Sequence, residues 1–148
     1  MEIILQALFS FIGVVAFGVL TNVPRTLLQW CGAIGTLSWL VYYLLINFGV
    51  NIFISYFISA MMIRLGSLIL AKIKRVPSTM FSIPSLVTVV PGGTAYQMIR
   101  YFAVGESNLG IGFLMQVIGI AVAISVGFLI ANLSFEKVKT IKVLIGRH

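Results

Sequence analysis

Acidic residues are scarce in this sequence. Only three of its 148 residues are acidic, and Glu2, Glu106 and Glu136 all lie at or beyond the ends of apolar segments. The single histidine, His148, is the last residue. The apolar segments therefore lack the side chains that most often hold metals or transfer protons in enzymes. We expect no catalytic residue, no metal site and no cofactor, and we do not expect an enzyme.

Cysteine and charge are also scarce. Cys31 is alone, which excludes an intrachain disulfide. Only 9% of the residues are charged and 60% are hydrophobic, whereas soluble domains carry roughly 25% charged residues. With a mean hydropathy of +1.13, the chain is predicted to be an integral membrane protein. The net charge of +7 does not indicate nucleic-acid binding, because the basic residues form no basic face with interleaved aromatics.

The apolar segments predict one all-α transmembrane domain over residues 1–148. A spanning helix needs about 20 apolar residues, so about five spans fit this length. We place them at 3–20, 27–48, 52–71, 79–102 and 109–133, followed by a basic cytoplasmic tail at 134–148. The first segment lacks the basic start of a secretory signal and is expected to be retained as a span.

The basic residues predict the orientation of these spans. With five spans, eight of the ten basic residues fall on one side of the membrane, and the other side has no Lys or Arg outside the spans. Basic loops mark the cytoplasmic side, so we expect the N-terminus outside and the C-terminus in the cytoplasm. The eight residues are Arg25, Lys72, Lys74, Arg75, Lys137, Lys139, Lys142 and Arg147.

The fourth predicted span, 79–102, is unlike the others because it contains Pro84 and the run Pro91-Gly92-Gly93. Proline removes a backbone donor and paired glycines weaken a helix, so we expect this span to be broken at Pro91-Gly92-Gly93. Non-helical backbone at membrane depth is tolerated only where protein buries it or where it lines a wet cavity. The break is therefore a candidate substrate site.

A break at Pro91 predicts a half-helix that starts near Thr94. Its free N–H groups and its dipole would favour a carboxylate, and the Thr94 and Tyr96 hydroxyls would add hydrogen bonds. The glycines, Gly92 and Gly93, would let a ligand approach the backbone. The alternative is a proline-kinked helix whose glycines only allow close helix packing.

Two arginines lie within predicted spans. Arg64 is eight residues before Lys72, and Arg100 ends the broken segment. A guanidinium inside a membrane usually faces a partner or a cavity, so both are candidates for attracting an anionic substrate. The alternatives are that Arg64 reaches the cytoplasmic interface and that Arg100 is an interfacial anchor. Other polar residues within spans, among them Gln6, Ser38 and Gln116, are expected to make helix-packing contacts.

The odd number of spans suggests half of a carrier. Many secondary transporters contain two similar halves of opposite orientation, and no convincing repeat is visible within this chain. The second half would then be a separate partner chain, with a homo-oligomer as the alternative. Any proton-coupling group would lie on the partner. A non-transporting scaffold subunit is the principal rival, and the chain lacks the charged ring or carbonyl filter of a channel.

Two stretches of the sequence resemble a known family. The first runs from Val14 to Arg25, contains Asn22-Val23-Pro24 and is followed by Trp30 to Gly35; the second runs from Phe81 to Tyr96 and contains Pro91-Gly92-Gly93. Together they resemble the small subunit of the split form of the threonine/serine exporter family. The resemblance implies a bacterial inner-membrane exporter that pairs with a larger membrane subunit. Its substrates would be threonine and serine, or a dicarboxylate such as succinate.

Overall fold

The computed structural model describes the backbone of residues 2–145 and the side chains of residues 2–137. Within this part of the chain there are six helices and no strand. An all-α fold is thereby confirmed. The helices are α1 (Glu2–Leu20), α2 (Arg25–Asn47), α3 (Ile52–Lys74), α4 (Thr79–Leu86), α5 (Gly92–Ala103) and α6 (Ser107–Ile145).

Short polar or glycine-containing turns end the first two long helices. After α1, Asn22 adopts the left-handed conformation and the Val23 N–H bonds to the Gly18 carbonyl at 2.9 Å, which satisfies one of the free carbonyls at the helix end. After α2, Gly49 likewise adopts the left-handed conformation, with a φ of 77°. Asn51 then begins α3, because its side chain accepts a hydrogen bond from the Phe53 N–H at 2.9 Å.

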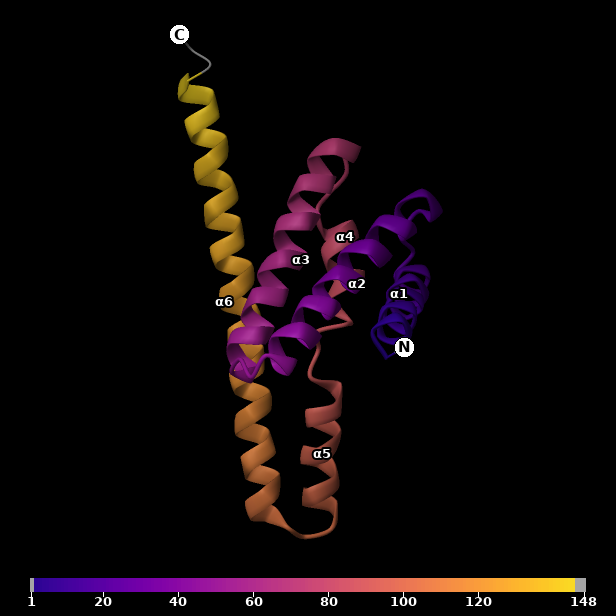
Figure 1. The fold of residues 1–148 in the computed structure, drawn as a ribbon, viewed down its shortest axis with the longest axis vertical. Coiled ribbons are helices and arrows are strands. Elements are labelled where there is room, and N and C mark those ends of the chain that lie inside the picture. Colours follow the sequence, from indigo (N-terminus) through magenta and orange to yellow (C-terminus); the bar gives the residue numbers. More distant parts are fainter. Residues whose placement is uncertain (1, 146–148) are drawn as a thin grey trace.

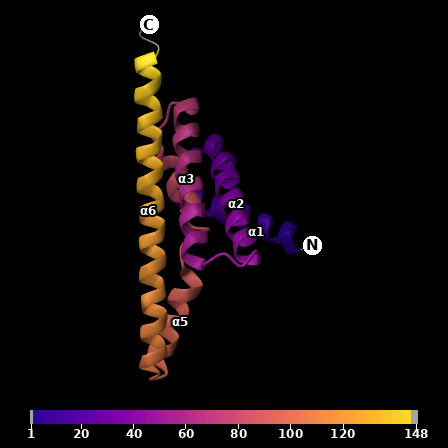
Figure 2. The same ribbon diagram turned by 60° about the vertical axis from the view of Figure 1, so that its left-hand side comes forward.

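The long helices lie side by side in the order α6, α3, α2, α1 across the molecule (Figures 1 and 2). The short helix α4 packs against α1, α2 and α3, whereas α5 contacts only α6 among these elements. The chain thus passes from a helix held by three neighbours to a helix held by one, across the five residues that separate α4 from α5.

Small residues allow α4 to lie deep among its neighbours. Phe81 and Ser85 of α4 are fully buried. Opposite them on α2, Gly35 has no side chain, and a Cβ there would lie 3.4 Å from the Ser85 Cα. The Ser85 hydroxyl also donates to the Cys31 carbonyl at 3.1 Å. This packing fixes the position of the segment that follows α4.

The first turns of α6 extend beyond the start of α3. A Cβ at Gly119 would meet the ring of Phe53, the second residue of α3, at 2.6 Å. Residues 107–118 of α6 therefore lie past that end of α3 and have α5 as their neighbour (Figure 1). There Tyr101 of α5 stacks on Phe113 of α6 with ring centroids 5.3 Å apart.

Four helices are long and apolar enough to cross a membrane: Glu2–Leu20, Arg25–Asn47, Ile52–Lys74 and Ser107–Lys137. The predicted fourth span, 79–102, consists of the two shorter helices α4 and α5. That α4 and α5 together form one additional, broken span, the fourth of five along the chain, stays a prediction. The orientation of the chain in the membrane stays a prediction as well. The helix α6 continues to Ile145, past the predicted end of the last span at 133 and into the predicted tail, where the end of the span itself stays a prediction.

Candidate substrate site

The α4–α5 junction is formed by residues 87–91. After α4, tight turns carry the chain to Val90, whose N–H bonds to the Leu86 carbonyl at 3.1 Å. Pro91 then departs from helical geometry, with φ −75° and ψ 54°. Proline has no N–H to continue a helix and also disfavours the helical conformation of the residue before it. The interruption therefore precedes the glycines, and Gly92 and Gly93 are the first two residues of α5 rather than the break itself.

The first turn of α5 leaves two backbone donors unused. The Gly92 N–H bonds to the Val90 carbonyl at 2.7 Å, and the first helical bond runs from the Ala95 N–H to the Pro91 carbonyl at 2.9 Å. The N–H groups of Gly93 and Thr94 between them have no acceptor among the described residues. Such N–H groups, together with the helix dipole, favour an anion at this end of α5.

Gly92 and Gly93 do not serve helix packing within this chain. A Cβ added to either would have no atom of the described residues within 4 Å, and neither has a positive φ. By contrast, a Cβ at Gly127 of α6 would lie 2.6 Å from the Phe57 carbonyl oxygen of α3. The alternative of a kink with packing glycines thus has no support from contacts inside the chain.

The remaining predicted residues of the junction differ in exposure. Pro91 and Thr94 are half-buried, whereas the Tyr96 side chain is 65% exposed. Neither the Thr94 nor the Tyr96 hydroxyl has a hydrogen-bond partner in the described part of the chain. Both hydroxyls are therefore free to bind another molecule, and Tyr96 lies on the outer surface of α5.

Arg64 belongs to α3. Its side chain lies beside the start of α4 and contacts both α6 and the residue that precedes α4. Its Nε donates to Asn132 Oδ1 of α6 at 2.7 Å, and a terminal nitrogen donates to the Ser78 hydroxyl just before α4 at 3.1 Å. The guanidinium carbon also lies 5.8 Å from the centre of the Phe128 ring. Through these hydrogen bonds, Arg64 of α3 braces the start of α4 against α3 and α6.

Arg100 lies in the last turn of α5 and is exposed. Its guanidinium carbon is 5.8 Å from the centre of the neighbouring Tyr101 ring. Eight residues separate it from Gly92, or roughly 12 Å along a helix. The structure therefore places Arg100 at the opposite end of α5 from the free N–H groups.

Two adjacent cavities flank the junction on the side of α1. One, of about 470 Å³, is apolar and reaches Gly92; it is lined by Phe17, Ile83, Leu86, Val87, Val90 and Gly92. The other, of about 320 Å³, shares Val87 with the first; it is lined by Gln6, Phe9, Ser10, Gly13, Trp39, Val87 and Thr88. The sequence interpretation assigned Gln6 to packing and overlooked Ser10 and Thr88, although a polar residue in an otherwise apolar helix was the available signal.

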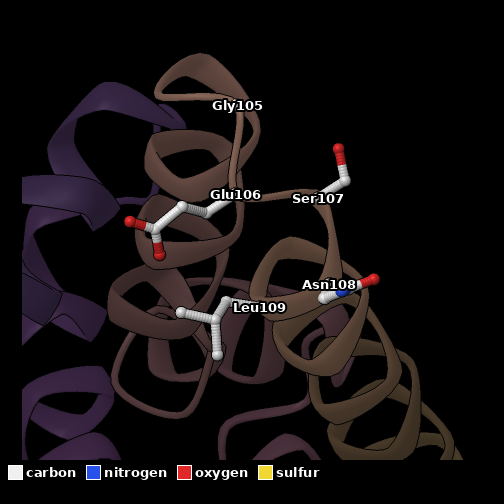
Figure 3. A pocket seen from close by; sticks show the side chains of 5 residues that line it. All are labelled: Gly105, Glu106, Ser107, Asn108 and Leu109. Atoms are coloured by element: carbon white, nitrogen blue, oxygen red, sulfur yellow. The ribbon is translucent and has the colours of Figure 1, made fainter.

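A third cavity, of about 350 Å³, lies at the turn between α5 and α6. Five consecutive residues form it, Gly105 to Leu109. The Glu106 and Leu109 side chains lie on one side of this turn, and Ser107 and Asn108 point away from them (Figure 3). Its only charged side chain, Glu106, would repel a carboxylate, so this cavity does not fit the proposed ligand.

The long apolar helices define a class of protein. α1 has only two buried residues, and large apolar side chains such as Ile4 and Phe9 are 73% and 67% exposed. A long, predominantly apolar helix whose large apolar side chains are not covered by protein belongs in a membrane. With four such candidate spans, the chain is a multi-pass membrane protein.

The chain belongs to the family described as threonine/serine exporter, ThrE, whose sequence profile matches residues 6–134. It is therefore a membrane transport protein of the exporter type, as the sequence resemblance predicted, and this membership implies a transporter rather than an enzyme. No curated protein matches the chain significantly. No solved structure does so either.

Proposed function

We propose that this chain is a membrane subunit of a secondary exporter for small carboxylate-bearing metabolites. The substrate is threonine or serine, or a dicarboxylate such as succinate, and transport proceeds by alternating access with a partner subunit. Family membership supports export as the activity. The observation that carries the site is the start of α5, where two free backbone N–H groups adjoin two glycines with open surroundings.

In this proposal the substrate carboxylate binds the N–H groups of Gly93 and Thr94. The positive end of the α5 dipole stabilises the charge, and the Thr94 hydroxyl adds a hydrogen bond. Gly92 and Gly93 leave room for the ligand to reach the backbone. Pro91 maintains the interruption between α4 and α5, and the Tyr96 hydroxyl is available for a hydrogen bond one turn further along α5.

The junction is also suited to movement. α4 is held by three helices and α5 by α6 alone, so a dihedral change within residues 87–91 moves α5 relative to α4. Such a hinge between two differently held elements is a common means of closing a protein around a ligand. Arg64 keeps the α4 side fixed through Ser78. Attraction of an anion by Arg64 or Arg100 stays a separate prediction.

The proposed setting is the bacterial inner membrane, with α4 and α5 together as the fourth of five spans. The start of α2, the end of α3 and the C-terminal end of α6 all lie at the same end of the molecule (Figure 1), which supports one cytoplasmic side for the basic residues there. The partner is a larger membrane subunit of the same family; a homo-oligomer is the alternative. Lipid contacts the exposed apolar surface.

Efflux from proteoliposomes that contain the complete exporter tests the proposed site. Gly92→Leu and Gly93→Leu place bulk in front of the free N–H groups, and we expect each to abolish efflux of a labelled substrate. Both side chains have open space in the folded chain, so normal yield and assembly are expected. Gly112→Leu is the matched control, because Gly112 is also a helical glycine with nothing within 4 Å. Unchanged efflux in both junction variants would rule out the site.

The rival function is that of a scaffold that stabilises a partner carrier without binding substrate. Reconstitution of each subunit alone and of both together separates the two. A scaffold predicts efflux by the partner alone and full efflux by Gly92→Leu in the pair. A transporting subunit predicts efflux only from the pair, and loss of that efflux in the variant.

A further inference from the structure

The polar residues of α1 all lie on one face of the helix. Glu2, Gln6 and Ser10 are the only polar residues between Glu2 and Leu20, and their spacing of four places them in one row. Gln6 and Ser10 line the smaller cavity beside the junction. Two of the three polar side chains of this otherwise apolar helix, Gln6 and Ser10, therefore face the cavity beside the α4–α5 junction.

Two aromatic residues of α2 form hydrogen bonds with Glu2 and Gln6, the first two residues of this row. The Tyr43 hydroxyl donates to Glu2 Oε2 at 3.4 Å, and Trp39 Nε1 donates to Gln6 Oε1 at 2.9 Å. Because the Trp39 N–H is a donor only, it requires the oxygen of the Gln6 amide to face it. The Gln6 NH₂ group is thereby left for another partner.

Two polar groups that line this cavity lack a partner in the described part of the chain. They are the Gln6 NH₂ group and the Ser10 hydroxyl. The Thr88 hydroxyl donates to the Ser85 carbonyl at 2.9 Å but retains lone pairs that can accept. A polar ligand in this cavity can form hydrogen bonds with these groups.

We propose that the Gln6–Ser10–Thr88 cavity binds the side-chain hydroxyl of the exported substrate. This inference rests on the proposed function, because it assumes that the carboxylate of the same molecule is at the start of α5. None of the lining residues is charged, so the cavity suits an uncharged group that both donates and accepts. The Gln6 NH₂ group donates a hydrogen bond to the substrate hydroxyl oxygen, and the Ser10 or Thr88 hydroxyl oxygen accepts a hydrogen bond from the substrate O–H.

The position and size of the cavity fit a small substrate. At about 320 Å³, it lies at the lower end of ligand pockets, which span roughly 300–1,000 Å³. Val87 lines both this cavity and the apolar one that reaches Gly92. The Gln6–Ser10–Thr88 cavity therefore adjoins, at Val87, the apolar cavity that reaches the first residue of α5.

Transport of serine and alanine, which differ by one hydroxyl, tests this assignment. In proteoliposomes with the complete exporter, we expect Gln6→Leu and Ser10→Ala each to lower the serine-to-alanine efflux ratio about tenfold, the effect of one lost hydrogen bond to the substrate. Alanine efflux itself should stay unchanged. Ser125→Ala is the control, since its exposed hydroxyl bonds only to the Ala121 carbonyl of its own helix.

A binding measurement removes the dependence on transport. In a Trp30→Phe background, Trp39 is the sole tryptophan, and serine but not alanine should shift its emission; Gln6→Leu should abolish the shift. An unaltered efflux ratio, or an equal loss for both substrates, would overturn the assignment. If the serine-to-alanine efflux ratio is unaltered and the variants also form a more stable exporter assembly, an apolar partner segment or a lipid chain occupies the cavity. That result would also overturn the assignment. If the unmodified exporter moves neither substrate nor any dicarboxylate, the proposed function itself fails.

Discussion

The packed helices and the α4–α5 junction use glycine in opposite ways. Between the packed helices, a Cβ at Gly32, Gly35 or Gly127 would lie only 2.5 to 2.6 Å from an atom of a neighbouring helix. At Gly92 and Gly93 no atom of the described residues lies within 4 Å of such a Cβ. Close packing explains glycine in the first region. In the second region no contact within the described chain requires glycine.

Polar groups show the same contrast. Among the packed helices, the Ser38 hydroxyl donates to the Ser59 carbonyl at 2.7 Å and Ser67 to the Ile63 carbonyl at 2.7 Å. At the junction, the N–H groups of Gly93 and Thr94 have no such acceptor. A membrane protein satisfies its buried polar groups internally wherever it can. Unused donors beside open glycines are the features on which the proposed substrate site rests.

The largest effect should come from filling a packed glycine. A Cβ at Gly127 would meet the backbone carbonyl oxygen of Phe57 at 2.6 Å, and backbone cannot move aside cheaply. We expect Gly127→Ala to lower the free energy of unfolding by about 3 kcal/mol, the upper part of the range for overpacking, as measured by denaturant titration in detergent. Gly119→Ala should cost less, because its contact is the movable ring of Phe53. Equal stability in Gly127→Ala and the parent protein would contradict the close α3–α6 packing.

The next largest effect concerns the brace at the entry to α4. Arg64→Met removes both hydrogen bonds of the guanidinium and leaves Asn132 Oδ1 without its partner. A loss of about 2 kcal/mol in the free energy of unfolding is expected. Arg64→Lys keeps the charge but not the planar set of donors, so it should also be destabilising. Arg100→Met, at an exposed site, should change stability by less than about 0.5 kcal/mol.

The same variants decide between bracing and attraction of an anion. If Arg64 acts through its charge, Arg64→Lys will keep both stability and substrate affinity, and Arg64→Met will raise KM without destabilising the protein. If Arg64 positions α4, both variants will lose stability together. A normal denaturation profile for Arg64→Met would refute the brace.

Composition and the lengths of the apolar segments were sufficient to predict the helical membrane fold. Runs of about 20 apolar residues have few other solutions, because backbone polar groups must pair internally in a bilayer. Three of the four long helices begin and end within three residues of the predicted spans. The exception is the end of α6, which continues to Ile145, because membrane hydropathy reports where lipid ends and not where a helix ends.

The surroundings of the predicted site residues could not be read from the sequence. Arg64 pairs with Ser78 and Asn132, and Asn132 is 68 residues away along the chain. Likewise Gln6 meets Thr88 at one cavity only because α1 packs against α4. A motif such as Pro91-Gly92-Gly93 predicts a break from local chemistry. Which side chains face that break depends on tertiary packing, which a single sequence does not encode locally.

The smallest effect provides the sharpest check on the two kinds of glycine. Gly92→Ala adds one methyl group in open space at a φ that alanine accepts, and such changes stabilise a protein by about 0.4–1 kcal/mol through the unfolded chain. We therefore expect unchanged or slightly raised stability, and the same for Gly112→Ala. Co-purification with the partner subunit adds a second measurement. If Gly92→Ala weakens that assembly while Gly112→Ala does not, Gly92 packs against the partner; retained assembly with reduced substrate affinity would instead favour the ligand, since the methyl group lies where the carboxylate approaches the first turn of α5.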